Sequence, residues 1–266
     1  MPRPTFYVGL HQPNHAHYFP QCMISINRLV KRAADGTYAR RRDGALKIRQ
    51  KPIGGRIFLD SGAFTVLDRY GHYPETPAEF CLAVRHLATL MNLVAVSSQD
   101  YMCEPFMLAR TGLTIAEHQR LTIERYDAIR AGLSAPIHVV PVIQGWTPAD
   151  YVRHLAAYGP RLNAGMWVGV GSVCKRNGKI QQLLEILMAI HTARPDLRLH
   201  GYGLKATAFR SSLVRDLLHS SDSLAWSYAA RRAGRDPNAW QEAQTYVERL
   251  VSTPVRDRPY QYAMTV

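Results

Sequence analysis

The sequence predicts an α/β protein with a TIM-like (β/α)8 barrel fold in a single domain, and three observations support this prediction. Short apolar runs alternate along the chain with longer segments of helical periodicity, which is typical of parallel strands joined by helices. At least six such units occur, and this number favours a closed barrel over an open doubly wound sheet. The first run is not followed by a Gly-x-Gly-x-x-Gly segment, which weakens the dinucleotide-binding form of the open sheet.

The elements follow from these runs in chain order. The predicted strands are the apolar runs 6–10, 56–59, 93–96, 137–143, 167–170 and 197–201. The predicted helices are 77–91, 115–131, 148–158, 179–193 and 208–219. Thr147 and Pro148 are a typical helix start, because a hydroxyl cap is followed by proline in the first turn.

The chain is expected to form one domain, 1–266, with two segments outside the regular alternation. Segment 31–56 is predicted to be a basic insertion after the first strand, since it holds nine Lys and Arg residues against two Asp. It suits either phosphate contacts or a solvated loop. Segment 236–266 is predicted to be a C-terminal helix and tail, with Trp240, Tyr246, Val247 and Leu250 packed on the barrel.

The charge of the chain indicates a polyanionic partner. A net charge of +13 and a pI near 9.9 suit phosphate neutralisation, although a generically basic protein is the alternative. No apolar stretch approaches the roughly 18 residues of a membrane span, and the N-terminus lacks a signal-peptide pattern, so a cytoplasmic location is expected. The four cysteines form no CxxC pair, which indicates neither a zinc site nor a disulfide framework.

Polar residues follow the predicted strands and should converge, because a barrel builds its active site at the carboxyl ends of its strands. Asp60, Asp100 and Asp222 stand at three such positions and Gln144 at a fourth. Any one of the aspartates could be a helix cap. Together they suit chemistry at a sugar anomeric carbon, where one carboxylate attacks and another transfers protons. The third carboxylate and the amide would suit the hydrogen-bonding edge of guanine.

These segments resemble those of a known family. Segment 60–64, DSGAF, resembles the DSGG(Y/F) motif of tRNA-guanine transglycosylases. Segment 142–145, VIQG, resembles their VQGG segment, and 168–171, VGVG, their base-binding strand. Segments 11–13, 99–105 and 221–227 are closer to the DpdA branch, relatives in phages and bacteria that insert 7-deazaguanines into DNA. The resemblance runs from about residue 10 to residue 235.

The resemblance implies roles for individual residues. Asp222 would be the nucleophile on C1′ and Asp60 the general acid and base. Asp100 and Gln144 would read the base edge. The glycines Gly145, Gly169 and Gly171 would bring backbone close to the base. Phe64 and Tyr202 would sandwich the purine, with barrel packing as the alternative for both.

Further residues are predicted to contact nucleic acid. His11 and His15 would contact phosphate or base at the barrel rim, or else form a hydrogen-bonded loop; as metal ligands they lack a clear partner. The basic candidates for phosphate contacts are Lys175, Arg176, Lys205, Arg40, Arg41 and Arg42. The CxCxxC…H zinc motif of the tRNA enzymes is missing from the sequence. We therefore expect no zinc or other cofactor, and this difference favours DNA.

The predicted function is exchange of guanine in DNA for a free 7-deazaguanine base. The same exchange on tRNA is the first alternative, and hydrolysis of a nucleoside or glycoside by the same aspartates is the second. A non-catalytic nucleic-acid-binding barrel is the third. The sequence leaves open which 7-deazaguanine is inserted, the sequence context, any partner protein and the oligomeric state.

Overall fold

A ring of parallel strands forms the centre of the computed structural model, which describes residues 4–256 except 51–53, 134–135 and 177. The ladder runs in the order β5-β4-β3-β2-β1-β9-β8-β7-β6, and all its pairings are parallel. The strands are β1 (Thr5–Gly9), β2 (Gln21–Ser25), β3 (Arg56–Asp60), β4 (Leu93–Ser97), β5 (Val139–Val140), β6 (Val142–Ile143), β7 (Trp167–Val170), β8 (Arg198–Gly201) and β9 (Ser220–Ser223).

The barrel is nearly closed, and the two ends of its strand ladder meet at Pro141. The first and last strands of the ladder, β5 and β6, are halves of one run and are separated by this residue alone. Proline has no N–H to donate, so the run is interrupted there. The Pro141 carbonyl still accepts the Gly169 N–H at 2.8 Å and links the run to β7. The predicted strand 137–143 and the predicted TIM-like barrel are thereby confirmed.

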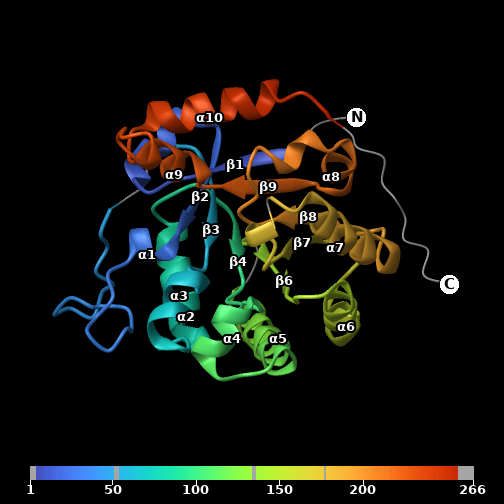
Figure 1. Cartoon of the computed structure of the whole chain (residues 1–266). Coiled ribbons are helices and arrows are strands. Elements are labelled where there is room, and N and C mark those ends of the chain that lie inside the picture. Colours follow the sequence, from blue (N-terminus) through green and yellow to red (C-terminus); the bar gives the residue numbers. More distant parts are fainter. Residues whose placement is uncertain (1–3, 51–53, 134–135, 177, 257–266) are drawn as a thin grey trace.

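Helices surround the ring and cover its outer face (Figure 1). They are α1 (Ile26–Leu29), α2 (Ala63–Tyr70), α3 (Pro77–Ala88), α4 (Pro105–Thr111), α5 (Ile115–Gly132), α6 (Pro148–Tyr158), α7 (Ile180–Ala193), α8 (Ser212–Leu217), α9 (Ala225–Arg232) and α10 (Trp240–Ser252). Short 3-10 helices are η1 (Pro13–Tyr18), η2 (Gly159–Arg161), η3 (Cys174–Arg176) and η4 (Ala208–Arg210). Capping boxes at Thr76, Thr114 and Thr147 begin α3, α5 and α6. No helix in the described part of the chain is long and apolar enough to cross a membrane.

Aromatic side chains fill the inside of the barrel. Tyr7, Phe58 and Trp167 form one buried cluster, with ring centroids 4.8–5.9 Å apart. A larger apolar cluster lies between the strands and the surrounding helices. Leu250 of α10 belongs to it, with Trp240, Tyr246 and Val247 packed against it, as the sequence predicted. The aromatic cluster lies inside the barrel, and Tyr202 at the end of β8 packs against it.

Strand β2 was missed by the sequence prediction, and this changes the place of the basic segment. Residues 31–56 follow β2 and α1 rather than the first strand, and Arg56 already belongs to β3. Ser220 to Ser223 form β9, although the sequence predicted only a junction there. Serine and aspartate have low strand propensity, but β9 is paired on both sides, with β1 and β8. Pairing in the closed ring therefore overrides local propensity.

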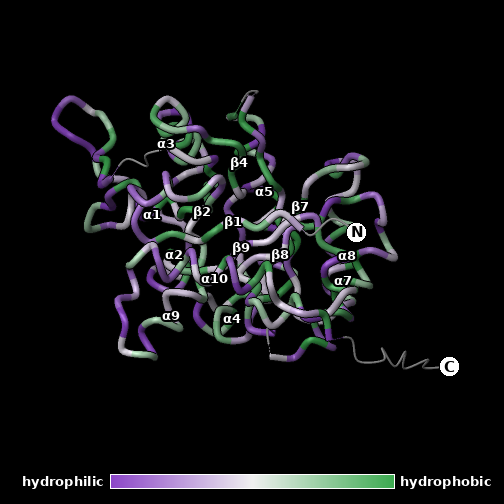
Figure 2. Tube along the Cα trace, turned by 90° about the horizontal axis from the view of Figure 1, so that it is seen from above, coloured by the Kyte–Doolittle hydropathy of each residue, from purple (hydrophilic) through white to green (hydrophobic). Residues whose placement is uncertain are grey.

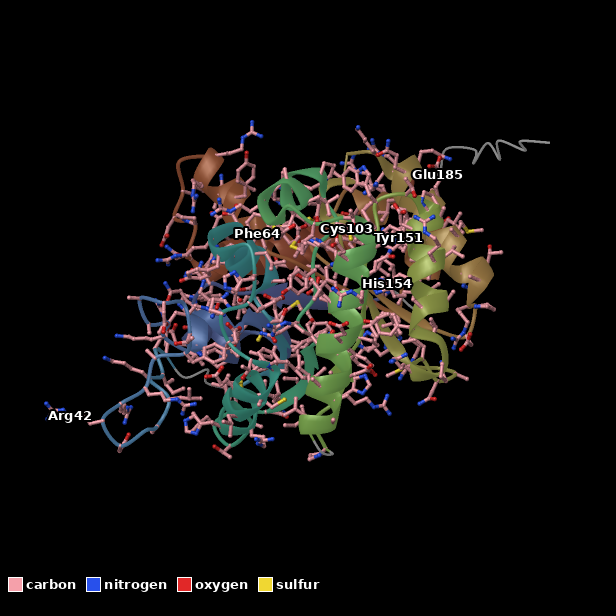
Figure 3. The ribbon with its side chains drawn as sticks, turned by 90° about the horizontal axis from the view of Figure 1, so that it is seen from below. Arg42, Phe64, Cys103, Tyr151, His154 and Glu185 are labelled. Carbon is pink, nitrogen blue, oxygen red and sulfur yellow. The ribbon has the colours of Figure 1, made fainter. Side chains whose placement is uncertain are left out.

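The basic arm, residues 31–50, projects from the barrel as a folded hairpin. Its antiparallel bridges join Val30 to Ile48, Arg32 to Tyr38 and Arg40 to Leu46. Its outer loop is hydrophilic (Figure 2), and Arg42 lies at its outermost end (Figure 3). Residues 51–53, which completed the predicted insertion, lie outside the described residues.

A buried ion pair holds the base of the arm to the barrel. Arg32 donates to both carboxylate oxygens of Glu75, at 2.7 and 3.1 Å, and Glu75 is 1% exposed. Gln99 and Tyr38 also donate to this carboxylate, at 2.8 and 3.2 Å. Because a buried charge without its partner is strongly destabilising, this pair fixes where the arm leaves the barrel.

We expect Arg32→Met to lower the free energy of unfolding by about 3 kcal/mol, because it leaves the Glu75 carboxylate buried without its counter-charge. Urea denaturation measures this change. Arg42→Met is the matched control, since Arg42 is exposed at the end of the same arm, and it should change stability by less than about 0.5 kcal/mol. Equal effects of the two substitutions would contradict the anchoring role.

Candidate active site

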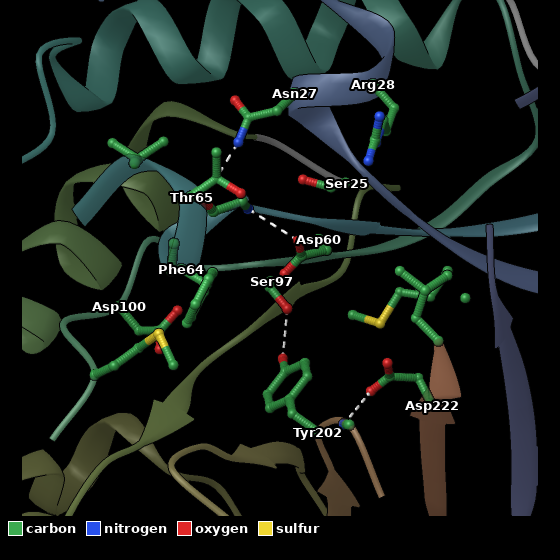
Figure 4. Close-up of a pocket in the computed structure, with 18 of the residues that line it drawn as sticks. Ser25, Asn27, Arg28, Asp60, Phe64, Thr65, Ser97, Asp100, Tyr202 and Asp222 are labelled. Carbon is green, nitrogen blue, oxygen red and sulfur yellow. Dashed lines mark hydrogen bonds between the residues drawn. The ribbon is translucent and has the colours of Figure 1, made fainter. Parts of the chain in front are cut away.

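A cavity of about 670 Å³ opens at the carboxyl ends of the strands. Because all strands are parallel, the residues that follow them meet at this one end of the barrel. The predicted catalytic and base-reading side chains line the cavity together: Asp60, Asp222, Asp100, Gln144, Phe64 and Tyr202. Figure 4 shows five of these six around the open space.

Asp60 ends β3 and faces the cavity from beside α2 (Figure 4). Its Oδ2 accepts the Gly62 N–H at 3.1 Å, and Ser25 at the end of β2 also hydrogen-bonds to the carboxyl group. Burial and the negative charge of Asp222 raise the pKa of Asp60 to about 6, against the opposing effect of these hydrogen bonds. A carboxyl group with this pKa can both give and take a proton near neutral pH.

Asp222 in β9 is held by two donors on one oxygen. Its Oδ1 accepts the Gly203 N–H at 2.9 Å and lies 3.3 Å from Nε2 of His200. Nδ1 of His200 is 2.9 Å from the Ser220 hydroxyl, which also accepts from the Trp167 indole at 2.8 Å. With Ser220 donating to Nδ1, Nε2 carries the proton and donates to Asp222. Neither hydrogen bond uses Oδ2.

Asp100, which follows β4, and Gln144, which follows β6, form a buried pair. The Gln144 side-chain amide donates to Oδ2 of Asp100, and both side chains are at least 90% buried. Burial raises the pKa of Asp100 to about 7; the hydrogen bond from Gln144 opposes this shift, and the charges of Asp60 and Glu104 add to it. The pair therefore presents hydrogen-bonding groups to the cavity, and the Asp100 carboxyl group can be protonated or ionised near neutral pH.

The three predicted glycines make room for side chains. A Cβ on Gly171 would lie 2.1 Å from the Gln144 amide, and one on Gly169 would lie 2.3 Å from the Tyr202 ring. A Cβ on Gly145 would meet Tyr151 of α6 at 2.9 Å. Gly171 lines the cavity, whereas Gly145 and Gly169 are not among its lining residues. Their effect on the site is indirect, through close packing.

The two predicted aromatic residues occupy different positions. The Tyr202 hydroxyl hydrogen-bonds to Ser97, which fixes the ring at the cavity wall over Gly169. Phe64 is 48% exposed at the rim, 6.0 Å from the Phe106 ring, and Lys175 lies over both rings. Tyr202 therefore has a fixed position at the wall, whereas Phe64 remains accessible.

Of the predicted phosphate ligands, Arg176 is placed where it cannot serve easily. It is 7% exposed, donates to the carbonyl groups of Ser172 and Trp146, and stacks on the Trp146 ring at 4.0 Å. Its guanidinium thus holds two loops together. Its neighbour Lys175 is exposed, as is Lys205, and the phosphate-binding role of both stays a prediction.

The histidines after β1 separate in the structure. His11 lines the cavity, with Nε2 2.8 Å from the Ser227 hydroxyl and Nδ1 3.0 Å from the Arg28 guanidinium. His15 lies farther out in η1, its ring 5.9 Å from that of Tyr18. No group of three or more His, Cys, Asp and Glu side chains suited to a metal ion occurs among the described residues, and the four cysteines form no disulfide bond there.

Four arginines line the cavity although sequence reasoning did not place them there. Arg28, Arg32, Arg49 and Arg69 all line it, and all except Arg32 are exposed. They come from α1, the basic arm and α2, which meet on one side of the cavity. The sequence offered little signal for this grouping, because β2, the strand that brings α1 to the cavity, was missed.

A comparison with protein-family models identifies the chain. The model for DpdA, described as DeoxyPurine in DNA protein A, matches residues 28–246. The chain belongs to the DpdA family. The match extends from α1 into α10 and includes all three aspartates of the cavity. A search of curated proteins found no match.

Membership in the DpdA family implies a role in 7-deazapurine modification of DNA, with DNA as the substrate. The family is related to the tRNA-guanine transglycosylases, and the resemblance stated from the sequence is thereby confirmed. The cavity gives this membership a physical site, since two coupled carboxyl groups and a buried carboxyl–amide pair face one space.

We expect Asp222→Asn to lower the pKa of Asp60 from about 6, because it removes the nearby negative charge. Burial is the larger cause and is retained, so the pKa should stay above the ordinary aspartate value of about 3.9. Carbon-13 NMR titration of the carboxyl groups measures it. Asp68→Asn, an exposed aspartate on α2, is the control; an unchanged Asp60 pKa in Asp222→Asn would disprove the coupling.

Proposed function

We propose that the protein exchanges guanine in DNA for a free 7-deazaguanine through a covalent bond between Asp222 and the deoxyribose. The observation that supports this most directly is the shared cavity of Asp60 and Asp222, in which one carboxylate raises the pKa of the other. A carboxyl group with a raised pKa and a second carboxyl group at one sugar site can divide the roles of proton carrier and nucleophile.

Base recognition is assigned to Asp100 and Gln144. An ionised Asp100 accepts from N1–H and the exocyclic amine of guanine, while the Gln144 nitrogen donates to O6. A 7-deazaguanine has the same edge, so one pocket can bind both the leaving and the entering base. The Tyr202 ring is suited to contact the face of the base, and the accessible Phe64 ring to contact its other face.

In the first half-reaction, an Asp222 carboxylate oxygen attacks C1′ of a deoxyguanosine turned out of the duplex. The C1′–N9 bond breaks and its electron pair remains on N9. Asp60 supplies the proton that N9 gains, directly or through a water. The products are free guanine, an ionised Asp60 and an ester between Asp222 and the sugar. His200 and Gly203 hold Oδ1, which keeps Oδ2 free for attack.

In the second half-reaction, a 7-deazaguanine occupies the vacated pocket. Its N9 attacks C1′, the bond from C1′ to the Asp222 oxygen breaks, and the N9 proton passes to Asp60. Asp222 leaves as a carboxylate and Asp60 is again protonated. Two inversions at C1′ return the original configuration, and the proton balance of the enzyme is unchanged.

The cationic rim is proposed to bind the phosphates of the modified strand. Arg28, Arg49 and Arg69 border the cavity, and Lys175 stands on its Phe64 side. Arg42, at the outer end of the basic arm (Figure 3), is proposed to contact phosphates farther from the cavity. Phosphate contacts of this kind fix the position of DNA without reading its sequence.

We expect Asp222→Asn to abolish both guanine release and the covalent protein–DNA species, because an amide is a poor nucleophile. Intact-protein mass spectrometry after denaturation detects the ester in the unmodified protein. Asp60→Asn should slow exchange by roughly 10²–10⁴-fold, the usual contribution of a proton-transfer group. Full exchange activity in Asp222→Asn would sink the assignment; Asp68→Asn should behave as the unmodified protein.

We expect replacing Arg40, Arg41 and Arg42 together by alanine to reduce the salt dependence of DNA binding. Removing one phosphate-binding side chain should lower the slope of log K against log salt by about 0.9, because fewer counterions are released. Fluorescence anisotropy over a salt series measures the slope. Arg120→Ala, an exposed arginine on α5, is the control; an unchanged slope in the triple variant would show that the arm does not bind phosphates.

A further inference from the structure

A continuous hydrogen-bonded chain runs behind the base-reading pair. The Ser172 hydroxyl lies 2.7 Å from Oε2 of Glu104 and 2.7 Å from Oε1 of Gln144. The nitrogen of the same Gln144 amide donates to Asp100. All four side chains are more than 90% buried. Two of them, Glu104 and Ser172, have no role in the reaction proposed above.

Ser172 has a strained backbone conformation, and its hydroxyl lies between Glu104 and Gln144 in this series of hydrogen bonds. Its φ of 54° makes it the one non-glycine residue with positive φ in the described part of the chain. The Cys103 N–H donates to the Ser172 hydroxyl at 2.9 Å and occupies one of its lone pairs. Strained residues of this kind persist where the surrounding contacts determine them and are common at functional sites.

The hydrogen count around Ser172 requires a proton on a neighbour. A hydroxyl has one hydrogen, but Ser172 has two oxygen neighbours at hydrogen-bonding distance. An amide oxygen carries no hydrogen, so the second must belong to the Glu104 carboxyl group. Glu104 therefore donates to Ser172, and Ser172 donates to Gln144. The other oxygen of Glu104 lies 3.9 Å from the Cys174 thiol, which donates to it.

The charges around Glu104 are compatible with a neutral acid. Burial raises the pKa of Glu104, while its hydrogen bond with Ser172 and the more distant charges of Lys175 and Arg176 lower it. No Lys, Arg or His ion pair to Glu104 is found among the described residues. A neutral Glu104 adds no negative charge to this end of the cavity.

We propose that Glu104 and Ser172 are positioning residues for base selection: Glu104 acts as a neutral hydrogen-bond donor to Ser172, and Ser172 fixes the Gln144 amide with its nitrogen toward the base. This inference rests on the proposed function, because it takes guanine as the base. If the amide were reversed and Asp100 carried the proton, the same two groups would bind 2,6-diaminopurine instead. That base has an acceptor at N1 and an amine at position 6, where guanine has a donor and an oxygen. The hydrogen bonds from Glu104 through Ser172 to Gln144 therefore select a purine with an oxygen rather than an amine at position 6.

The protonation of Glu104 has a direct spectroscopic test in the full chain. We expect the infrared spectrum at neutral pH to contain the carbonyl stretch of a protonated carboxyl group that disappears in Glu104→Gln and remains in Asp100→Asn. A spectrum in which Glu104→Gln removes no such band would overturn the proposal, whatever Asp100→Asn removes. This test does not depend on catalysis or on DNA.

The selection role is tested by calorimetric binding of free guanine and 2,6-diaminopurine. The unmodified protein should prefer guanine, and Ser172→Gly, which keeps the left-handed backbone, should reduce this preference by roughly tenfold. Ser172→Ala is the second variant with the same expectation. Glu104→Gln, which keeps a neutral donor, should retain the preference. So should Ser98→Ala, which removes a buried hydroxyl for which no partner is found among the described residues.

The outcomes separate the inference from the function on which it rests. Selective guanine binding by the unmodified protein, with unchanged preference in both Ser172 variants, would overturn the positioning role and leave the proposed function standing. Loss of preference in Glu104→Gln to the level of Ser172→Gly would overturn the neutral-donor role of Glu104. A lack of preference in the unmodified protein would overturn the proposed function and this inference together.

Discussion

Three aspartate carboxyl groups, one buried and two half-buried, share one cavity, and their placement is the constraint on which the rest of the site depends. A buried carboxylate is unfavourable unless donors surround it, and otherwise its pKa rises. Each aspartate accepts hydrogen bonds from a different set of donors. Asp222 receives a backbone N–H and the His200 ring, Asp60 receives a backbone N–H and Ser25, and Asp100 receives the Gln144 amide. These partners leave Asp60 and Asp100 with raised pKa values near neutrality, which is where proton transfer and hydrogen-bond switching are most useful.

Two features of the barrel bring these donors to the aspartates. Its parallel strands end on one side, and the aromatic side chains that fill its interior also form hydrogen bonds. Tyr7, Phe58 and Trp167 pack together as a buried apolar cluster inside the barrel. The Trp167 indole also begins the hydrogen-bonded chain through Ser220 and His200 to Asp222. Packing and electrostatics are therefore linked here, since the same side chain fills the barrel and orients the carboxylate that we propose as nucleophile.

Sequence reasoning found the carboxylates but not their supports, for physical reasons. Asp60 and Asp100 were recognisable because each follows a short apolar run, whereas Asp222 was recognised through the family resemblance. His200 sits inside such a run and reads as a core residue; its contact with Asp222 depends on the pairing of β8 with β9. Lys175 and Arg176 are adjacent and equally basic, yet only packing decides that Arg176 turns inward. Gly169 shows the same limit, because the sequence indicates empty space beside a strand but not whether a base or the Tyr202 ring fills it.

The central claim, base exchange on DNA, is tested most directly by nucleoside mass spectrometry. The protein is incubated with 7-cyano-7-deazaguanine and either plasmid DNA or bulk tRNA, and the digested nucleosides are compared. Our account predicts a deazaguanine deoxynucleoside from DNA, with release of free guanine and no product from tRNA. Incorporation into tRNA alone, or release of guanine from DNA without incorporation of the deazaguanine, would contradict it.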